Sequence, residues 1–132
     1  MNELFAYRNC FICGRDSRNG LKVDFAVTER GARASHTVGD DFEGFEGVVH
    51  GGILCALLDE IMWKAINGQT GAITVTAKMD VRFKKPVPVG TRLLIEGFIT
   101  GRKRRIFEAR GVITDREKNI LAEATGLFME MD

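Results

Sequence analysis

Two groups that can do chemistry lie eight residues apart in one segment, at Gly51 and Asp59. Gly51 and Gly52 open an apolar run, so their amides are expected at a helix N-terminus. N–H groups are unpaired there, and the helix dipole favours negative charge. Since glycine has no side chain, a ligand can reach these amides. Asp59 and Glu60 lie in the middle of the run, where a buried carboxylate is unfavourable unless it is paired or used. The segment therefore combines an anion-binding helix start with a functional acid.

Gly51 and Asp59 of the same helix cannot contact the same reacting atom. Eight helical residues rise about 12 Å, whereas an aspartate side chain reaches only a few ångströms. Two antiparallel copies of the helix would bring Gly51 of one chain to Asp59 of the other. If the site is catalytic, the sequence predicts that it is shared across a dimer.

The element that carries both groups is predicted to be a buried helix. Residues 53–66 contain no Gly or Pro and consist mostly of Leu, Ile, Ala and Met. Apolar residues occur nearly all round this helix, which is typical of a helix covered on every side. Gly68 is the predicted stop.

Apolar alternation predicts strands on both sides of the helix. The predicted strands are residues 21–27, 32–38, 72–83, 92–100, 105–114 and 120–131. Short turns join the last four, which indicates an antiparallel meander. A sheet with one face to cover and one long apolar helix predicts a single α+β domain over residues 1–132. We expect a curved antiparallel sheet wrapped round the central helix.

The composition excludes several classes of protein. The chain has 132 residues, a net charge of +1 and 45% hydrophobic residues. This charge predicts no nucleic-acid or membrane partner. The sequence contains no run of eighteen apolar residues and no signal-peptide pattern, so we expect a soluble, cytoplasmic protein.

The three cysteines, Cys10, Cys13 and Cys55, are an odd number, which argues against a disulfide framework. Cys10 and Cys13 have a spacing that can ligate zinc, but a structural site needs four ligands. The sequence has no second pair, and the two histidines, His36 and His50, are distant. Reduced structural thiols are therefore favoured over a metal or redox role, and neither a metal nor a cofactor is predicted.

The segment 47–52 with 57–60, GVVHGG and LLDE, resembles the hotdog-fold acyl-CoA thioesterases of the phenylacetate-pathway type. The resemblance extends to CFICG at 10–14, to VRF at 81–83 and to PVPVG at 86–90, and covers nearly the whole chain. It implies a hotdog fold, an acyl-CoA substrate and active sites at the interface of a dimer or of a dimer of dimers.

The resemblance also implies roles for individual residues in thioester hydrolysis. Asp59, nine residues after His50, corresponds to the nucleophile or general base. Gly51 corresponds to the residue whose amide binds the thioester carbonyl, with Gly52 beside it. Some relatives carry a Ser or Thr on the strand after the helix, where Thr74 and Thr76 are the candidates here.

Two other groups beside Asp59 are given supporting roles. His50 is expected to brace the loop rather than to act as the base. Glu60 points roughly 100° away from Asp59 on a helix, and it is the alternative acid.

Coenzyme A carries phosphates, so a basic patch is expected near the mouth of the site. The available cations are Lys84, Lys85, Arg102, Lys103, Arg104 and Arg105. A solvated turn is the competing interpretation of these residues. Two other functions remain open: a hotdog module that binds acyl-CoA without hydrolysing it, and a hotdog dehydratase that uses His50 with an acid.

Overall fold

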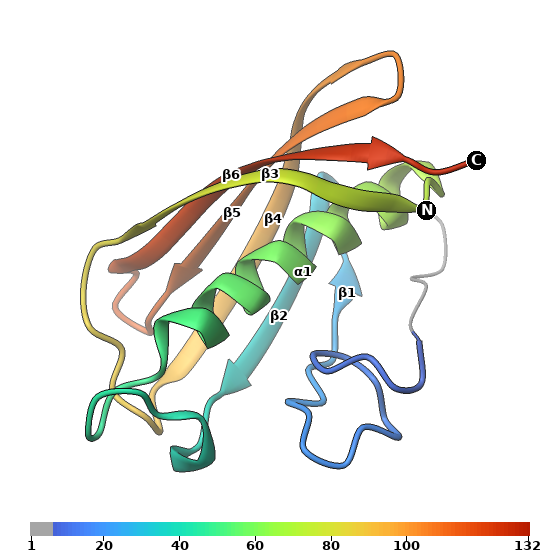
Figure 1. The fold of residues 1–132 in the computed structure, drawn as a ribbon. Coiled ribbons are helices and arrows are strands. Elements are labelled where there is room, and N and C mark those ends of the chain that lie inside the picture. The colour runs from blue at the N-terminus through green and yellow to red at the C-terminus, as the bar shows by residue number, and fades with distance from the viewer. Residues whose placement is uncertain (1–6) are drawn as a thin grey trace.

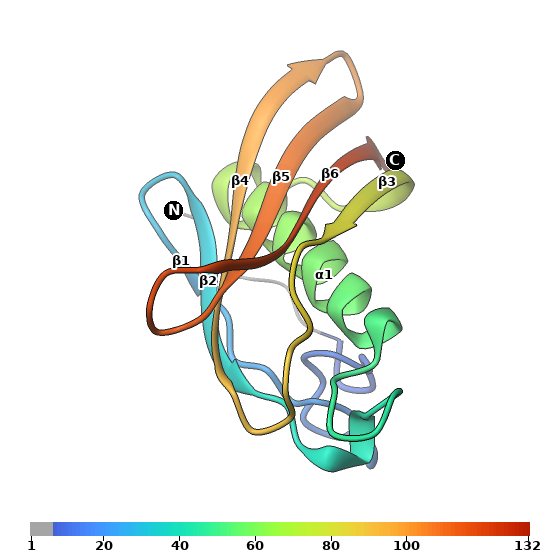
Figure 2. The same cartoon turned by 90° about the vertical axis from the view of Figure 1, so that its left-hand side faces the viewer.

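The computed structural model of the chain describes residues 7–132 and contains one six-stranded antiparallel sheet and one long helix (Figure 1). The strand order is β1-β2-β4-β5-β6-β3. The elements are β1 (Ala26–Val27), β2 (Gly31–Thr37), the 3-10 helix η1 (Asp40–Phe42), α1 (Gly51–Thr70), β3 (Thr74–Phe83), β4 (Arg92–Lys103), β5 (Ile106–Thr114) and β6 (Ile120–Glu130). Figure 2 shows α1 lying along one face of the curved sheet. The predicted fold class, a curved antiparallel sheet round one long helix, is confirmed.

Two glycines in the middle of the sheet let α1 lie directly on the strand backbone. Gly97 of β4 is paired with Gly111 of β5. A Cβ at position 97 would lie 2.5 Å from the carbonyl oxygen of Ile61, and one at position 111 would lie 3.1 Å from Ile61 Cγ2. Ile61 is completely buried at this contact, which lies two residues after Asp59 on the helix.

The helix begins where the sequence predicted but is longer than predicted at its C-terminal end. It begins at Gly51 and runs to Thr70, whereas the predicted stop, Gly68, is buried within its last turn. The helix ends at Gly71, which has φ 77° and donates its N–H to the Asn67 carbonyl. The Asn67 side chain donates to the Ala72 carbonyl. The left-handed conformation that only glycine adopts easily therefore occurs at the second glycine, not the first.

The first predicted strand, residues 21–27, is wrong for most of its length. Only Ala26–Val27 joins the sheet. Leu21 and Val23 are buried, as their alternation predicted, but their N–H groups bond to the carbonyls of Phe11 and Ile12. This stretch therefore pairs with the chain just before it instead of with the sheet. Residues 7–25, called the N-terminal segment below, form a separate layer against α1.

The strand β3 lies at an edge of the sheet, paired only with β6. It is ten residues long. The side chains of Val75 and Phe83 in this strand are 48% and 53% exposed, and that of Ile73, just before it, is 40% exposed. A long edge strand with exposed apolar side chains offers unpaired backbone groups to another strand.

None of the helices within residues 7–132 is long and apolar enough to cross a membrane.

Candidate active site

The amide of Gly51 is accessible at the first position of α1. Among the hydrogen bonds of the described residues, none uses the Gly51 N–H as a donor, whereas the next three amides of the helix all bond to His50. A Cβ at position 51 would meet only the Phe83 ring, at 3.7 Å and 3.8 Å. An unpaired N–H at the positive end of the helix dipole is suited to bind a carbonyl oxygen that gains negative charge.

His50 is the N-cap residue of α1. Its Nδ1 accepts the Gly52 N–H at 2.8 Å, and its carbonyl accepts the N–H groups of Ile53 and Leu54. Gly44 lies beneath the ring, where a Cβ would come within 3.1 Å of His50 Cδ2. The ring nitrogen that accepts a backbone N–H is not available as a base, so the geometry favours the bracing role expected for His50. The Gly52 N–H therefore helps to fix the orientation of this ring.

Asp59 lies in the middle of α1 with its carboxylate directed at β3. The Thr76 hydroxyl donates to Asp59 Oδ1 at 2.6 Å. Burial raises the pKa of Asp59 above its usual value, and the Thr76 hydrogen bond acts in the opposite direction. This hydrogen bond fixes the orientation of the carboxylate and favours its ionised form.

A β-bulge places Thr76 and the odd-numbered residues that follow it on the same face of β3. Thr76 pairs with Phe128 and Lys78 pairs with Leu127, so Ala77 is the extra residue. Side chains normally alternate between the two faces of a strand, and an extra residue reverses the alternation. Thr76 faces the helix through its bond to Asp59. After the bulge, Met79 and Val81 face the same side and pack against the core. Sequence spacing alone could not determine this register.

Glu60 points away from Asp59 and contacts the N-terminal segment. Its Oε1 lies 3.5 Å from Cys13 Sγ, 3.9 Å from Cys10 Sγ and 3.7 Å from Lys64 Nζ. Lys64 is only 2% exposed. Burial raises the pKa of Glu60, and the Lys64 ammonium opposes that increase. Burial also raises the pKa of the Cys13 thiol to about 12. At neutral pH this thiol is protonated, which makes it a poor nucleophile.

A cavity of about 360 Å³ connects the two acids. Its walls come from α1, from the start of β3 and from the N-terminal segment. They include Asp59, Glu60, Trp63, Thr74 and Val75. The Trp63 indole N–H donates to the Thr74 carbonyl at 2.7 Å and joins the helix to the strand. The cavity can hold a small apolar group next to the Asp59 carboxylate.

The predicted basic residues separate into two groups. Lys84 and Lys85 follow β3, and the loop that they open bonds to the loop before α1, through Val49 N–H to Val87 O and Val89 N–H to Gly47 O. This pair therefore lies at the end of the molecule where Gly51 lies.

The other four basic residues lie at the β4–β5 hairpin, beyond the opposite end of the helix (Figure 1). Arg102 and Lys103 belong to β4, not to the predicted turn. Arg102 forms an ion pair with Glu130 and Arg105 with Asp132. Arg104 occupies the turn with φ 57°.

Replacing Thr76 with Val is expected to lower kcat by about 10–100-fold with little change in KM. The change removes one hydrogen bond to a charged group, worth roughly 1.5–3 kcal/mol, and about 1.4 kcal/mol of lost transition-state stabilisation is a factor of ten. Steady-state kinetics measures this effect, and Thr76→Ser should restore kcat.

Thr74→Val is the matched control for Thr76→Val. The Thr74 side chain is buried, and within the described residues its hydroxyl has no hydrogen-bond partner. Because Thr74 also lines the cavity, this control is compared through kcat alone, which is expected to stay unchanged. Equal losses of kcat in the two variants, or a drop in Tm that accounts for the lost activity of Thr76→Val, would contradict the positioning role of Thr76.

Solved structures define the class of this fold. The Escherichia coli PaaI protein from the phenylacetic acid degradation operon aligns with a TM-score of 0.78 at 21% identity, over 85% of this chain and 81% of that chain. The protein smu.793 from Streptococcus mutans UA159, solved bound to acetyl CoA, aligns with a TM-score of 0.76 at 25% identity, over 83% of this chain and 88% of that chain. The sheet wrapped round one helix is thus the hotdog fold of the thioesterases, as the sequence motifs predicted.

Sequence comparison defines the family. Residues 46–122 match the family model of the thioesterase superfamily. Acyl-coenzyme A thioesterase THEM4 from Bos taurus is 32% identical over 95 residues, which are 71% of this chain and 38% of that protein. The chain therefore spans less than half the length of this curated relative. The chain belongs to the thioesterase superfamily, and its resemblance to the acyl-CoA thioesterases is confirmed.

Proposed function

We propose that the chain hydrolyses an acyl-CoA thioester to the free acid and CoA. The observation that carries this proposal is that one helix holds two groups suited to this reaction. The first is the Gly51 N–H at the helix start, which has no hydrogen-bond acceptor among the described residues. The second is the half-buried carboxylate of Asp59, which the Thr76 hydroxyl holds in place. The Gly51 amide polarises the thioester carbonyl and stabilises the oxyanion that develops on it. Asp59 either removes a proton from the attacking water or attacks the carbonyl itself. The carbon–sulfur bond then breaks, and CoA leaves as a thiolate that takes up a proton. If Asp59 is the nucleophile, this step leaves an acyl–Asp59 anhydride, which water then hydrolyses to the free acid while the carboxylate is restored.

The proposed site is shared between two chains. About 12 Å of helix separates Gly51 from Asp59, and their contacts on β3, Phe83 and Thr76, are seven residues apart. The edge strand β3 supports this dimer, because its free edge and exposed apolar side chains suit pairing with β3 of a second copy. The two helices then run antiparallel, and each Gly51 approaches the Asp59 of the other chain. A dimer, or a dimer of such dimers, is the proposed active form.

The cavity beside Asp59 is the proposed acyl site. Trp63, Val75 and Met131 give it apolar walls, while Asp59 lies at its border. Binding of acyl-CoA is supported by the relatives, since one curated relative is an acyl-coenzyme A thioesterase and one structural neighbour was solved with acetyl CoA.

A panel of acyl-CoAs tests the proposed reaction against its two alternatives. Release of the CoA thiol, followed with a thiol reagent and corrected for the three cysteines of the protein, supports hydrolysis. Binding without thiol release would identify a binding module. New enoyl absorbance from a β-hydroxyacyl-CoA would identify a dehydratase. His50 accepts the Gly52 amide, which leaves a dehydratase without the histidine that it needs and favours hydrolysis.

The double variant Lys84→Gln, Lys85→Gln is expected to raise the KM for acyl-CoA by a few-fold. The two lysines are the predicted phosphate-binding cations at the Gly51 end of the molecule, and each exposed charge contributes about 0.2–1 kcal/mol. Small acyl thioesters that lack the nucleotide should keep their KM. The effect should diminish at high salt, because screening weakens exposed charge pairs.

The matched comparison neutralises Arg102, Lys103, Arg104 and Arg105. A smaller rise in KM is expected there, since these four cations lie at the β4–β5 hairpin, away from the Gly51 end of the helix (Figure 1). An equal loss for acyl-CoA and for small thioesters in both multiple variants would show that neither group binds the phosphates.

A further inference from the structure

The N-terminal segment brings two thiols to a carboxylate of α1. Cys10 and Cys13 are separated by 47 or more residues from Glu60 in the sequence. One sulfur or oxygen atom from each residue lies within 4.8 Å of the others. The sequence shows only the two thiols, and therefore favours reduced structural cysteines. The third group becomes visible only when α1 packs against the segment.

We propose that Cys10, Cys13 and Glu60 bind one zinc-class divalent cation, which ties the N-terminal segment to α1. A tetrahedral Zn²⁺ with sulfur at about 2.3 Å and oxygen at about 2.1 Å places each sulfur about 3.6 Å from the oxygen. The distances from Glu60 Oε1 to Cys13 Sγ and Cys10 Sγ are 3.5 Å and 3.9 Å. Both sulfur–oxygen distances are therefore already close to those that such an ion requires.

The backbone around Cys10 is arranged to stabilise a thiolate. The N–H groups of Ile12 and Cys13 both donate to Cys10 Sγ, each at 3.4 Å. The next amide, Gly14 N–H, bonds to the Cys10 carbonyl at 2.8 Å and closes the turn. A Cβ at position 14 would lie 2.4 Å from backbone atoms, so only glycine fits there. Hydrogen bonds that orient a ligand atom are a regular feature of metal sites.

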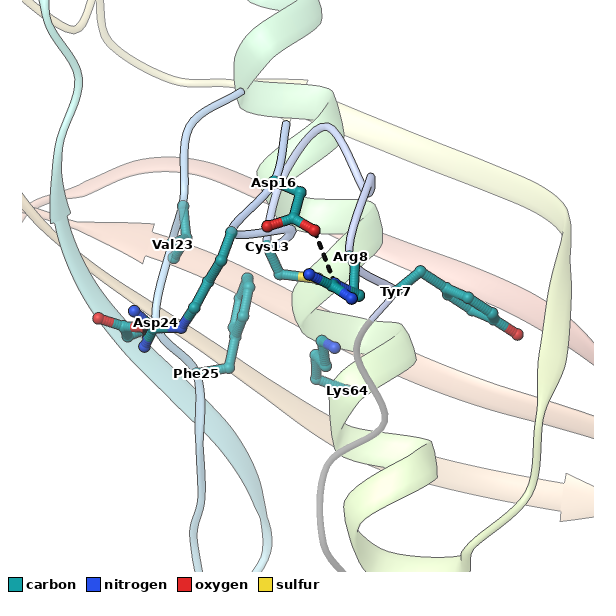
Figure 3. Close-up of a pocket in the computed structure, with 9 residues that line it drawn as sticks. Tyr7, Arg8, Cys13, Asp16, Val23, Asp24, Phe25 and Lys64 are labelled. Atoms are coloured by element: carbon teal, nitrogen blue, oxygen red, sulfur yellow. Dashed lines mark hydrogen bonds and ion pairs between the residues drawn. The ribbon is translucent and has the colours of Figure 1, made fainter. Parts of the chain in front are cut away.

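The charges around the three ligands also balance when the cation is present. Two thiolates and one carboxylate carry three negative charges. A divalent cation and the Lys64 ammonium, 3.7 Å from Glu60 Oε1, carry three positive charges. A buried group of charges is tolerated when it is paired to neutrality. Figure 3 shows Cys13 and Lys64 in the wall of the neighbouring cavity, one from the N-terminal segment and the other from the helix.

The fourth ligand position has a source of water. Cys10, Cys13 and Glu60 all line the cavity that also reaches Asp59. A water molecule in this cavity can complete four-fold coordination. The ion would then act as a clamp that holds one wall of the proposed acyl site against α1.

Cobalt substitution tests the site without any reference to enzyme activity. The reduced, chelator-treated full chain is titrated with Co²⁺ under anaerobic conditions. We expect one equivalent per chain, the visible absorption of tetrahedral Co²⁺, and a thiolate-to-cobalt charge-transfer band with the intensity of two thiolates. Stoichiometric Zn²⁺ should displace the cobalt and raise Tm, because a ligand that binds only the folded state stabilises it.

Three variants and one matched control identify the ligands. Cys10→Ser and Cys13→Ser should each halve the charge-transfer band, and the loss of affinity should exceed the roughly 10–100-fold that follows loss of an outer-shell partner. Glu60→Gln should keep the band of two thiolates but bind at least about tenfold more weakly. Cys55→Ser is the control, because Cys55 is also a half-buried free cysteine but lies outside the cluster. It should bind like the wild type.

Three results would overturn the proposal. The first is a wild-type protein that takes up no Co²⁺ or Zn²⁺ in the micromolar range. The second is binding that survives in Cys10→Ser and Cys13→Ser, and the third is unchanged affinity in Glu60→Gln. The wild-type spectrum alone counts the thiolates, so the test also stands if one variant fails to fold.

Discussion

Asp59→Asn should fold like the wild type and lose most of the proposed thioesterase activity. General acid–base catalysis by one group contributes about 10²–10⁴-fold, so kcat/KM for acyl-CoA should fall by a factor in this range. Asparagine has nearly the same shape and can still accept the Thr76 hydroxyl, which donates to Asp59 Oδ1. The CD spectrum and the Tm should therefore remain those of the folded protein.

The control for Asp59→Asn is the same substitution at Asp24. The Asp24 side chain is exposed and pairs only with Arg15 among the described residues, so Asp24→Asn should keep full activity. If Asp59→Asn retained activity within a few-fold of the wild type, the catalytic assignment would be wrong and Glu60 would become the acid to test. A lost fold would instead assign a structural role to Asp59.

Mixing two inactive proteins should restore activity if the site is shared. Asp59→Asn chains lack the acid, and Gly51→Val chains carry a side chain that blocks the approach to the helix-start amide. In a heterodimer, one site carries both changes and the other carries neither. Two symmetric sites per dimer then predict up to about half of the wild-type activity per heterodimer. The measurement is acyl-CoA hydrolysis after subunit exchange, with heterodimer formation followed by mass spectrometry.

The structure makes Gly51→Val a suitable partner in this experiment. Gly51 does not have a positive φ, and a Cβ there would meet only Phe83 at ordinary contact distance. The variant is therefore expected to fold and to dimerise. If exchange occurs and no activity returns, each chain must build its own site. An active monomer would lead to the same conclusion.

The parts of the site that the sequence predicted are those that depend on local spacing. The glycines before an apolar run place an amide at a helix start, and the helical rise separates Gly51 from Asp59. Thr74 and Thr76 were both candidates for the supporting hydroxyl, but the strand face that carries them was not predictable, because the extra residue Ala77 reverses the alternation along β3. A strand pattern read with a strict period of two cannot show where a bulge occurs.

The contacts of Glu60 were not predictable for a different reason. They join residues at least 47 positions apart, and they depend on the N-terminal segment pairing with itself instead of with the sheet. The alternation of Leu21 and Val23 correctly predicted burial, but burial against the sheet and burial against a neighbouring segment produce the same pattern. The Cys-x-x-Cys spacing was the one signal in the sequence that pointed to this region.

The protein is expected to tolerate substitutions in much of its core, but not at the glycine pair beneath Ile61. At Gly97 the distance between helix and sheet is limited by backbone atoms of Ile61, which cannot rearrange in the way that side chains do, whereas at Gly111 it is limited by the side chains of Leu58, Ile61 and Met62. Core substitutions elsewhere can be absorbed by repacking, and should alter thermal stability before they move Asp59. A methyl group added at position 97 would lift the helix at its midpoint and displace the carboxylate relative to the other chain. The accuracy of the proposed active site would then depend on two residues that touch neither substrate nor acid, and directed evolution of substrate range should leave both unchanged.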